Sequence, residues 1–210
     1  MDVAREIDHA ISELRDCDRL IVDWRGNPGG GAVGLRLMSY ITPDKIPVGY
    51  SLSKKRAEKG YTKGRLPRFG KIPLRKIELF DLAFRYAFAG KSIVMATEGL
   101  APQPFQGRIA LPVNQHTASA AETDTGFAHE NNLATIVGTR TAGQVLGGIG
   151  FKMGHGLVLR IPVVTFHTWS GKTLEGKGVE PGPVVEFSRD FLWTGLDAQI
   201  ERASHIARFF

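Results

Sequence analysis

The sequence has a single cysteine, Cys17, so no disulfide can form within the chain, and a thiolate-rich metal site is excluded as well. No apolar run approaches the roughly 18 residues that a helix needs to span a bilayer. The N-terminus has no basic region followed by an apolar stretch, which excludes a signal peptide in these residues. We therefore expect a globular chain that is cytoplasmic as it stands, or periplasmic or exported if the N-terminus is truncated.

Acidic residues are scarce in one long segment. The chain has 27 lysines and arginines against 21 aspartates and glutamates, which gives a net charge of +6. From residue 54 to residue 76, ten basic residues lie against a single acid, Glu58. Such a run could attract nucleic acid or anionic lipid, but only Tyr61 and Phe69 are interleaved, unlike the aromatic spacing of a single-strand binding groove. Its glycines and prolines predict a solvated, flexible basic loop over residues 54–76, and a nucleic-acid partner is not favoured.

Hydrophobic patterning predicts the secondary structure. Apolar residues at helical spacing alternate along the chain with short apolar runs typical of buried strands. This alternation argues for an α/β fold in one domain over residues 1–210, with a β-rich C-terminal segment over residues 151–187 and a final helix. The expected helices cover 3–15, 35–40, 77–88, 118–130 and 192–207, and the expected strands cover 20–22, 48–52, 93–95, 109–113, 134–137, 157–159, 161–164 and 184–185.

A glycine-rich turn follows the first expected strand. Residues 25–31 read Arg-Gly-Asn-Pro-Gly-Gly-Gly and precede an expected helix. Backbone N–H groups left unpaired at such a turn can bind an anion, or the oxyanion that develops during acyl transfer. Turns of this kind also bind phosphates or simply reverse the chain. A Walker loop is excluded, because no Gly-Lys-Ser/Thr follows.

Ser119 lies among small residues at the start of the expected helix 118–130. A helix N-terminus stabilises negative charge, so a serine alkoxide or an oxyanion is favoured there, and small neighbours leave room for a substrate backbone. The alternative is structural. Thr117 or Ser119 would cap the helix, and Glu122 would complete a capping box, since Ser119-x-x-Glu122 has that form. The spacing alone leaves both interpretations open.

Two further segments, residues 138–144 and 169–181, indicate on their own only turns that join strands. Taken in order with the glycine-rich turn and the Ser119 segment, they resemble the tail-specific (C-terminal processing) serine protease family. That family has a Leu-Arg-x-Asn-Pro-Gly-Gly turn, a Ser-Ala-Ser-Ala-Ser-Glu nucleophile segment, a Gly-x-x-Thr-x-Gly-Lys loop and a late Glu-Gly-x-Gly-Val-x-Pro-Asp motif. The resemblance covers residues 3 to 187.

The resemblance implies an α/β core of the crotonase and ClpP type that hydrolyses peptide bonds, often near the C-termini of its substrates. It implies Ser119 as the nucleophile, and an oxyanion hole made of the backbone N–H of Ser119 and that of Gly29 or Gly30. Asn27 and Gln144 are the implied substrate-binding residues. The implied partners are a peptide or protein substrate and a second copy of the chain in a homo-oligomer. Acyl transfer of this kind needs no metal and no organic cofactor.

The sequence departs from the family pattern at the general base. One bacterial branch uses the lysine of the Gly-x-x-Thr-x-Gly-Lys loop, but the matching residue here is Gln144, whose amide cannot accept a proton at neutral pH. Lys152 lies eight residues further on and is not at the motif position. A second branch resembles the tricorn core protease and uses serine, histidine and glutamate. Glu175 matches its glutamate, the alternative being a solvated loop carboxylate, and the sequence therefore favours the histidine-using branch.

No histidine matches the base of that branch, which lies well upstream of the Asn-Pro-Gly-Gly turn. His9 lies off the apolar stripe of its expected helix, which indicates a surface residue, and His116 has poor reach. The simplest interpretation is that an N-terminal portion is missing or that a partner chain supplies the base. Other open interpretations are a catalytically inactive peptide-binding or scaffold relative and a crotonase-like acyl-CoA enzyme. Asp23 and Asp124 are interpreted as a strand-end carboxylate and a charge on a helix face.

Overall fold

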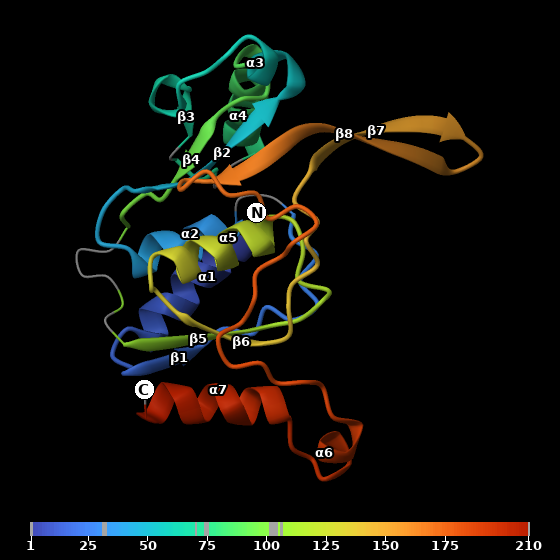
Figure 1. The fold of residues 1–210 in the computed structure, drawn as a ribbon. Coiled ribbons are helices and arrows are strands. Elements are labelled where there is room, and N and C mark those ends of the chain that lie inside the picture. Colours follow the sequence, from blue (N-terminus) through green and yellow to red (C-terminus); the bar gives the residue numbers. More distant parts are fainter. Residues whose placement is uncertain are drawn as a thin grey trace.

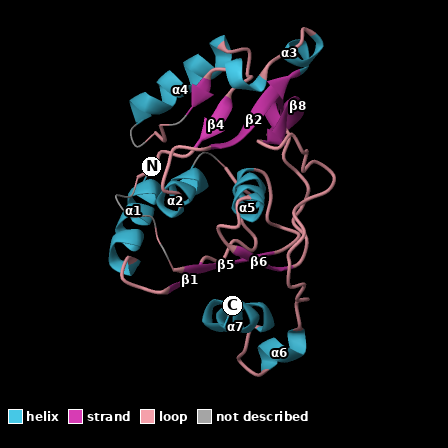
Figure 2. Ribbon diagram, turned by 60° about the vertical axis from the view of Figure 1, so that its left-hand side comes forward, coloured by secondary structure: helices cyan, strands magenta, loops and turns pink. Residues whose placement is uncertain are grey.

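Two β-sheets, with helices between them and outside them, form the mixed α/β fold of the computed structural model, which describes residues 2–30, 33–69, 71–73, 76–100, 105 and 107–209. Helices α1, α2 and α5 lie between the two sheets (Figure 1, Figure 2). Helix α4 covers the outer face of one sheet and α7 that of the other (Figure 2). The elements are α1 (Asp2–Leu14), β1 (Arg19–Ile21), α2 (Val33–Ile41), β2 (Pro47–Ser53), α3 (Lys54–Glu58), the 3-10 helix η1 (Lys63–Arg65), β3 (Arg68–Phe69), α4 (Lys76–Phe88), β4 (Val94–Ala96), β5 (Arg108–Val113), α5 (Ala120–Glu130), β6 (Thr135–Gly138), β7 (Gly147–Gly154), β8 (Leu157–Thr168), α6 (Arg189–Trp193) and α7 (Ala198–Phe209).

The three-stranded sheet is parallel throughout and has the order β1-β5-β6. Its central strand, β5, is buried from Ile109 to Val113, which explains its continuously apolar sequence. The carboxyl ends of parallel strands meet at one edge of a sheet, where ligands commonly bind. Here that edge receives the glycine-rich turn after β1, the Ser119 segment after β5 and the 138–144 loop after β6. The topology therefore gathers three sequence motifs that lie far apart in the chain.

The five-stranded sheet has the order β3-β4-β2-β8-β7 and is antiparallel except between β3 and β4. Helix α5 lies between the two sheets, and every residue from Ala121 to Ala128 is buried. Its Phe127 belongs to the main core together with Met38, Leu111 and Ile136. Because the polar residues of α5 are buried as well, they must find partners inside the protein.

The segment 54–76 differs in part from the flexible loop expected from its basic composition. It contains α3, η1 and β3, and it is anchored by the buried side chain of Leu66. The Lys63 Nζ atom donates to the Trp169 carbonyl at 2.7 Å and lies 4.5 Å from the centre of the Trp169 ring. A short strand and these anchors therefore hold much of the segment against the five-stranded sheet.

The C-terminal part differs from expectation in three places. Strand β8 is continuous where two short strands were expected, and its partner β7 begins at Gly147, before the expected β region. The expected strand at 184–185 is reduced to one bridge between Gly138 and Val184. The expected helix 192–207 is divided into α6 and α7, because Gly195 has a φ of +79° and a left-handed glycine ends a helix.

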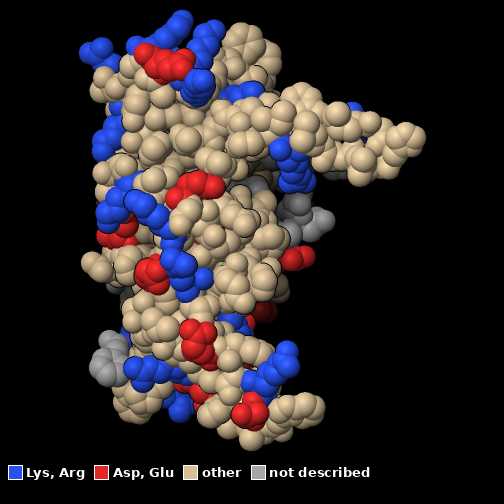
Figure 3. All heavy atoms as spheres, turned by 45° about the vertical axis from the view of Figure 1, so that its right-hand side comes forward, with Lys and Arg blue, Asp and Glu red and all other residues tan. Residues whose placement is uncertain are grey.

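The β7–β8 hairpin projects from the body of the molecule (Figure 1). In the space-filling view it is a largely uncharged arm (Figure 3), with Lys152 and Arg160 as its charged residues. Met153, Leu157 and Val158 are exposed on it. No helix within the described ranges is both long and apolar enough to cross a membrane.

Helix α7 is attached to the rest of the fold by apolar and polar contacts. Ala203 and Ile206 pack against Ala110 and Val137 of the three-stranded sheet. The Arg25 guanidinium, in the glycine-rich turn, donates to the Asp197 carboxylate at 2.7 Å and to the Gln199 side-chain oxygen at 3.0 Å. It also pairs with Asp23 at 2.6 Å, so Asp23 is a strand-end carboxylate with a structural partner.

Candidate active site

Ser119 occupies the N-cap position of α5 with a φ of 55° and a ψ of −121°. A non-glycine residue rarely adopts a positive φ, and such strain is common at functional sites. The turn that holds it is fixed from the glycine-rich segment, since the Ala118 N–H donates to the Asn27 carbonyl at 2.9 Å. The structure thus brings Ser119 and Asn27 to one point at the end of the parallel sheet.

Gly29 lies directly against Ser119. It has a φ of +79°, and a Cβ atom there would lie 2.6 Å from both the Ala118 carbonyl oxygen and the Ala120 nitrogen. Only glycine satisfies both the backbone angle and the close approach. Gly30, with a φ of +112°, has open space where a side chain would be. The glycine-rich turn therefore serves to bring backbone close to the serine.

Glu122 connects Ser119 to the loop after β6. Its carboxylate is fully buried and accepts hydrogen bonds from the Thr141 hydroxyl at 2.5 Å, the Gly143 N–H at 2.6 Å and the Gln144 N–H at 2.8 Å. It also accepts from the Ser119 N–H at 3.3 Å, and the two residues form a capping box. The contact between Glu122 and Ser119 expected from the spacing is therefore present, and the same carboxylate also fixes the 141–144 loop beside Ser119.

Glu175 is half-buried and bound to the same loop. Its carboxylate accepts from the Val145 N–H at 2.7 Å and from the Leu146 N–H at 3.1 Å. Glu175 is therefore an ordered loop anchor rather than a solvated carboxylate. The structure brings it next to the segment that follows Gln144, while its hydrogen-bond partners are backbone groups.

The two N–H groups expected to bind an oxyanion have acceptors inside the chain. The Ser119 N–H donates to the Gln144 carbonyl at 2.9 Å, and the Gly29 N–H donates to the Asn27 side-chain oxygen at 2.9 Å. Both interactions must be exchanged before these groups could bind a substrate oxygen. The Gln144 carbonyl oxygen is thus the present acceptor of the Ser119 N–H group that a substrate oxygen would need.

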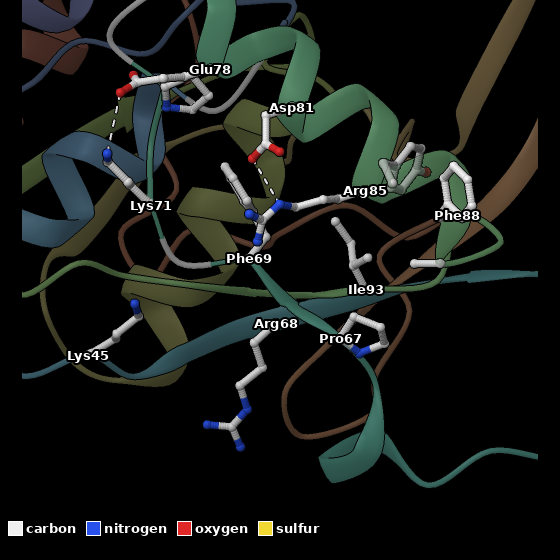
Figure 4. Close-up of a pocket in the computed structure, with 13 residues that line it drawn as sticks. Lys45, Pro67, Arg68, Phe69, Lys71, Glu78, Asp81, Arg85, Phe88 and Ile93 are labelled. Atoms are coloured by element: carbon white, nitrogen blue, oxygen red, sulfur yellow. Dashed lines mark hydrogen bonds and ion pairs between the residues drawn. The ribbon is translucent and has the colours of Figure 1, made fainter.

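A cavity of about 460 Å³ lies between the start of α5 and the five-stranded sheet, with Ser119 at its wall. A larger cavity of about 870 Å³ shares Phe69, Tyr86 and Ile93 with it, and contains the ion pairs Lys71–Glu78 and Arg85–Asp81 (Figure 4). A third, of about 500 Å³, includes Gly29 and Gly30 and meets the first at Ala120 and Asp124. The cavity beside Ser119 is lined mainly by apolar residues: Leu35, Val48, Phe69, Ala83, Ile93, Met95, Ala120, Val145, Val164 and Phe166.

Asp124 was expected to be a charge on a helix face, and this is wrong because the residue is only 4% exposed. The reason is that α5 is covered by a sheet on each side, so its polar sequence does not face solvent. Burial raises the pKa of the Asp124 carboxyl to about 8. None of the hydrogen bonds found among the described residues involves this carboxyl. The sequence did not indicate that Asp124 lines the same cavity as Ser119, because the polar sequence of α5 is typical of an exposed helix.

Among the described residues that line the cavity beside Ser119 there is no histidine. His9 is a surface residue, as expected, with 74% of its side chain exposed and a 3.4 Å contact to Glu13. His116 contacts Gln115, and His167 stacks on Tyr50 with ring centres 5.2 Å apart. Within the described residues, no group of three or more His, Cys, Asp and Glu side chains could hold a metal ion.

The structure thus holds a serine in a strained turn at a helix start, against a glycine-rich turn, within a mixed α/β fold. The chain belongs to peptidase family S41, whose family model matches residues 1–185. The expected family resemblance is thereby confirmed.

The relatives are proteases of considerably greater length. The carboxyl-terminal-processing protease of Synechocystis sp. is 24% identical over 185 residues, which is 87% of this chain and 35% of that protein. The tricorn protease of Thermoplasma volcanium is 32% identical over 111 residues, which is 50% of this chain and 11% of that protein. A solved structure of the photosystem II D1 C-terminal processing protease has a TM-score of 0.61 at 18% identity, over 88% of this chain and 39% of that one. This chain thus spans 35% of the length of its Synechocystis relative.

Proposed function

We propose that this chain is the catalytic core of a serine-type peptidase, with Ser119 as its nucleophile. The observation that carries the proposal is the strained φ of 55° at Ser119, at the start of α5 and in contact with Gly29, in a chain of peptidase family S41. A helix N-terminus favours the negative charge that develops during acyl transfer. The apolar cavity beside Ser119 supports a peptide or protein as substrate.

In the proposed reaction the Ser119 Oγ atom attacks the carbonyl carbon of the scissile peptide while a base takes the hydroxyl proton. The carbonyl oxygen becomes an oxyanion that accepts from the N–H groups of Ser119 and of Gly29 or Gly30. The base then protonates the leaving amine, and water releases the acyl group in the same way. Asn27 and Gln144 bind the substrate backbone in this proposal.

Opening of the site is a required step, because the Gln144 carbonyl accepts from the Ser119 N–H at 2.9 Å. The Glu122 and Glu175 carboxylates hold the two ends of the 143–146 segment through its backbone N–H groups. A substrate carbonyl that replaced the Gln144 oxygen would keep the donor satisfied. Catalytic geometry is often completed only when the substrate binds, which supports such an exchange.

We propose a histidine as the base, in a Ser-His-Glu arrangement in which Glu175 orients the imidazole. Gln144 stands at the lysine position of the other branch and cannot serve. Because the chain spans 35% of its Synechocystis relative, the base is proposed to come from sequence outside these 210 residues or from a second copy. The layering of α1, α2 and α5 between two sheets supports a core of the crotonase and ClpP type, in one domain over residues 1–210.

Association with a second copy is part of the proposal. The β7–β8 hairpin carries exposed apolar side chains at Leu157 and Val158, and exposed patches of this kind mark interaction surfaces. Light scattering compares the wild-type chain with a Leu157→Ser, Val158→Ser variant. A mass above the 23.0 kDa of one chain, lost in the variant, is expected, and a monomer in both contradicts the association.

Fluorophosphonate labelling tests the nucleophile. We expect a fluorophosphonate probe to react stoichiometrically with Ser119 in the second-copy assembly or the longer chain that supplies the base, because the probe needs an activated serine beside oxyanion donors. Ser119→Ala should abolish labelling and hydrolysis of a casein-derived peptide mixture. Ser188→Ala is the matched control, since Ser188 is also an N-cap serine, on α6.

The inactive alternative predicts a different outcome. A peptide-binding relative would bind peptides equally well in the wild type and in Ser119→Ala and would show no labelling in either. Absence of labelling in the wild-type chain, with the second copy and a longer chain both tested, would remove Ser119 from the nucleophile role.

A further inference from the structure

Asp124 is the buried carboxyl that the proposed reaction does not use. It is 4% exposed and lines both the cavity that contains Ser119 and the neighbouring one that contains Gly29 and Gly30. Within the described chain its carboxyl has no hydrogen-bond or ion-pair partner. Buried polar groups are nearly always paired, so an unpaired carboxyl at a cavity indicates a group that a ligand supplies.

The cavity walls offer no counter-charge. Among the described residues that line the two cavities there is no lysine, arginine or histidine, and Tyr86 is the other titratable side chain. The remaining wall beside Ser119 is largely apolar, with Leu35, Met95 and Phe166 among its residues. A ligand that satisfied this site would combine an apolar stem with a cationic end.

Gly34, at the start of α2, makes room for the carboxyl. A Cβ atom at this position would overlap the Asp124 Oδ2 atom. The backbone of Gly34 is not left-handed, so its conformation does not require glycine. The structural reason for a glycine here is the space that the Asp124 carboxyl occupies. Two helices therefore form this part of the cavity wall: α5 contributes the Asp124 carboxyl, and α2 contributes the glycine that leaves space for it.

We propose that Asp124 binds the ammonium or guanidinium group of a lysine or arginine side chain, on the substrate residue whose carbonyl Ser119 attacks. The inference rests on the proposed function, since it places that residue at Ser119. The methylene stem of the side chain lies against the apolar wall, as long basic side chains do when only their charged end is polar. The ion pair forms beside largely apolar walls, where it offsets the cost of burying the carboxyl.

Equilibrium binding to Ser119→Ala tests the proposal without relying on catalysis. Two peptides are compared that differ only by lysine or norleucine at one position, which changes the cation and keeps the stem. We expect the lysine peptide to bind about tenfold more tightly or better, and Asp124→Asn in the same background to remove the difference. Asp190→Asn is the matched control, because Asp190 is an exposed aspartate on α6 and its loss removes the same charge. Gly34→Ala should reduce the preference by displacing the carboxyl.

The outcomes separate this proposal from the one on which it rests. The role of Asp124 is overturned if Ser119→Ala binds the norleucine peptide as tightly as the lysine peptide or more tightly. It is also overturned if the preference for lysine survives Asp124→Asn. Thermal unfolding of each variant shows whether it is folded. Fluorophosphonate labelling of otherwise wild-type Asp124→Asn reports on Ser119 alone. Loss of lysine preference with labelling retained supports Asp124, whereas a preference with no labelling in any variant contradicts the nucleophile and leaves the cation site supported.

Discussion

Glu122 and Asp124 lie two residues apart on α5, and both are buried, yet their surroundings differ completely. Four donors surround the Glu122 carboxylate, three of them from the 141–144 loop. The Asp124 carboxyl faces a cavity with apolar walls, and burial raises its pKa to about 8. Two buried acids in the same site therefore have different roles. Glu122 has its donors within the chain and acts as an anchor, whereas Asp124 lacks them and is open to a ligand.

The strongest test of the contrast is removal of the anchor. Glu122→Ala leaves the Thr141 hydroxyl and the Gly143 and Gln144 N–H groups buried without their acceptor. We expect a loss of about 3–5 kcal/mol in the free energy of unfolding, as for other buried charged networks, measured by urea denaturation. Glu122→Gln keeps one acceptor oxygen and should lose less. Equal small losses in both variants would contradict the role of anchor.

The glycine-rich turn gives the next largest effect. Gly29→Ala meets the backbone of Ala118 and Ala120 at 2.6 Å, in addition to the strain of its positive φ. We expect a loss of about 3 kcal/mol together with loss of fluorophosphonate labelling, because the turn is pushed away from Ser119. Gly26→Ala is the matched control, since Gly26 also has a positive φ but has no atom within 4 Å of an added Cβ. It should cost about 1 kcal/mol and keep the labelling.

A pH series tests the buried carboxyl of Asp124. With a folded pKa of about 8, Asp124 keeps its proton in the folded chain between roughly pH 4 and pH 8, where an unfolded aspartate has lost it. Stability from this group is therefore complete below pH 4 and falls as the pH rises, by about 1 kcal/mol per pH unit. Asp124→Asn should remove this part of the slope, so the variant gains stability over the wild type as the pH rises from 5 to 7.5. A constant difference over that range would contradict the buried, unpaired carboxyl.

The smallest expected effect concerns the second loop anchor. Glu175→Gln keeps an acceptor for the Val145 and Leu146 N–H groups but removes the charge, which should cost about 1 kcal/mol of stability. If Glu175 also orients the base, hydrolysis falls further than stability does, through kcat rather than KM. An unchanged kcat in a folded Glu175→Gln variant would restrict Glu175 to holding the loop.

Much of the fold could be predicted from the sequence because apolar periodicity reports burial directly. The strands β1, β2, β5 and β6 and the helices α1 and α4 lie where their patterns predict them. The division of the last helix depended on Gly195, whose left-handed backbone ends α6. The first half of β7 was missed because its sequence, Gly-Gly-Ile-Gly, has little side-chain pattern and owes its structure to pairing with β8.

The candidate site was only partly visible in the sequence. Ser119 and the glycine-rich turn could be found because their residue types are special at the level of the backbone. Asp124 could not, because α5 has a polar sequence that is typical of an exposed helix, and only the two sheets around it show that it is buried. The partners of Glu122 lie 19 to 22 residues further along the chain, so no local pattern indicates them.

The bonds from Arg25 to Asp197 and Gln199 have a practical consequence for where this protein can be cut. The family match ends at residue 185, before Asp197 and Gln199 and before the whole of α7. A fragment that ended at residue 185 would expose the outer face of the parallel sheet and leave Arg25 with Asp23 as its remaining acidic partner. The residues matched by the family model are therefore fewer than the residues that pack around this site. An expressed fragment of the chain should include α7.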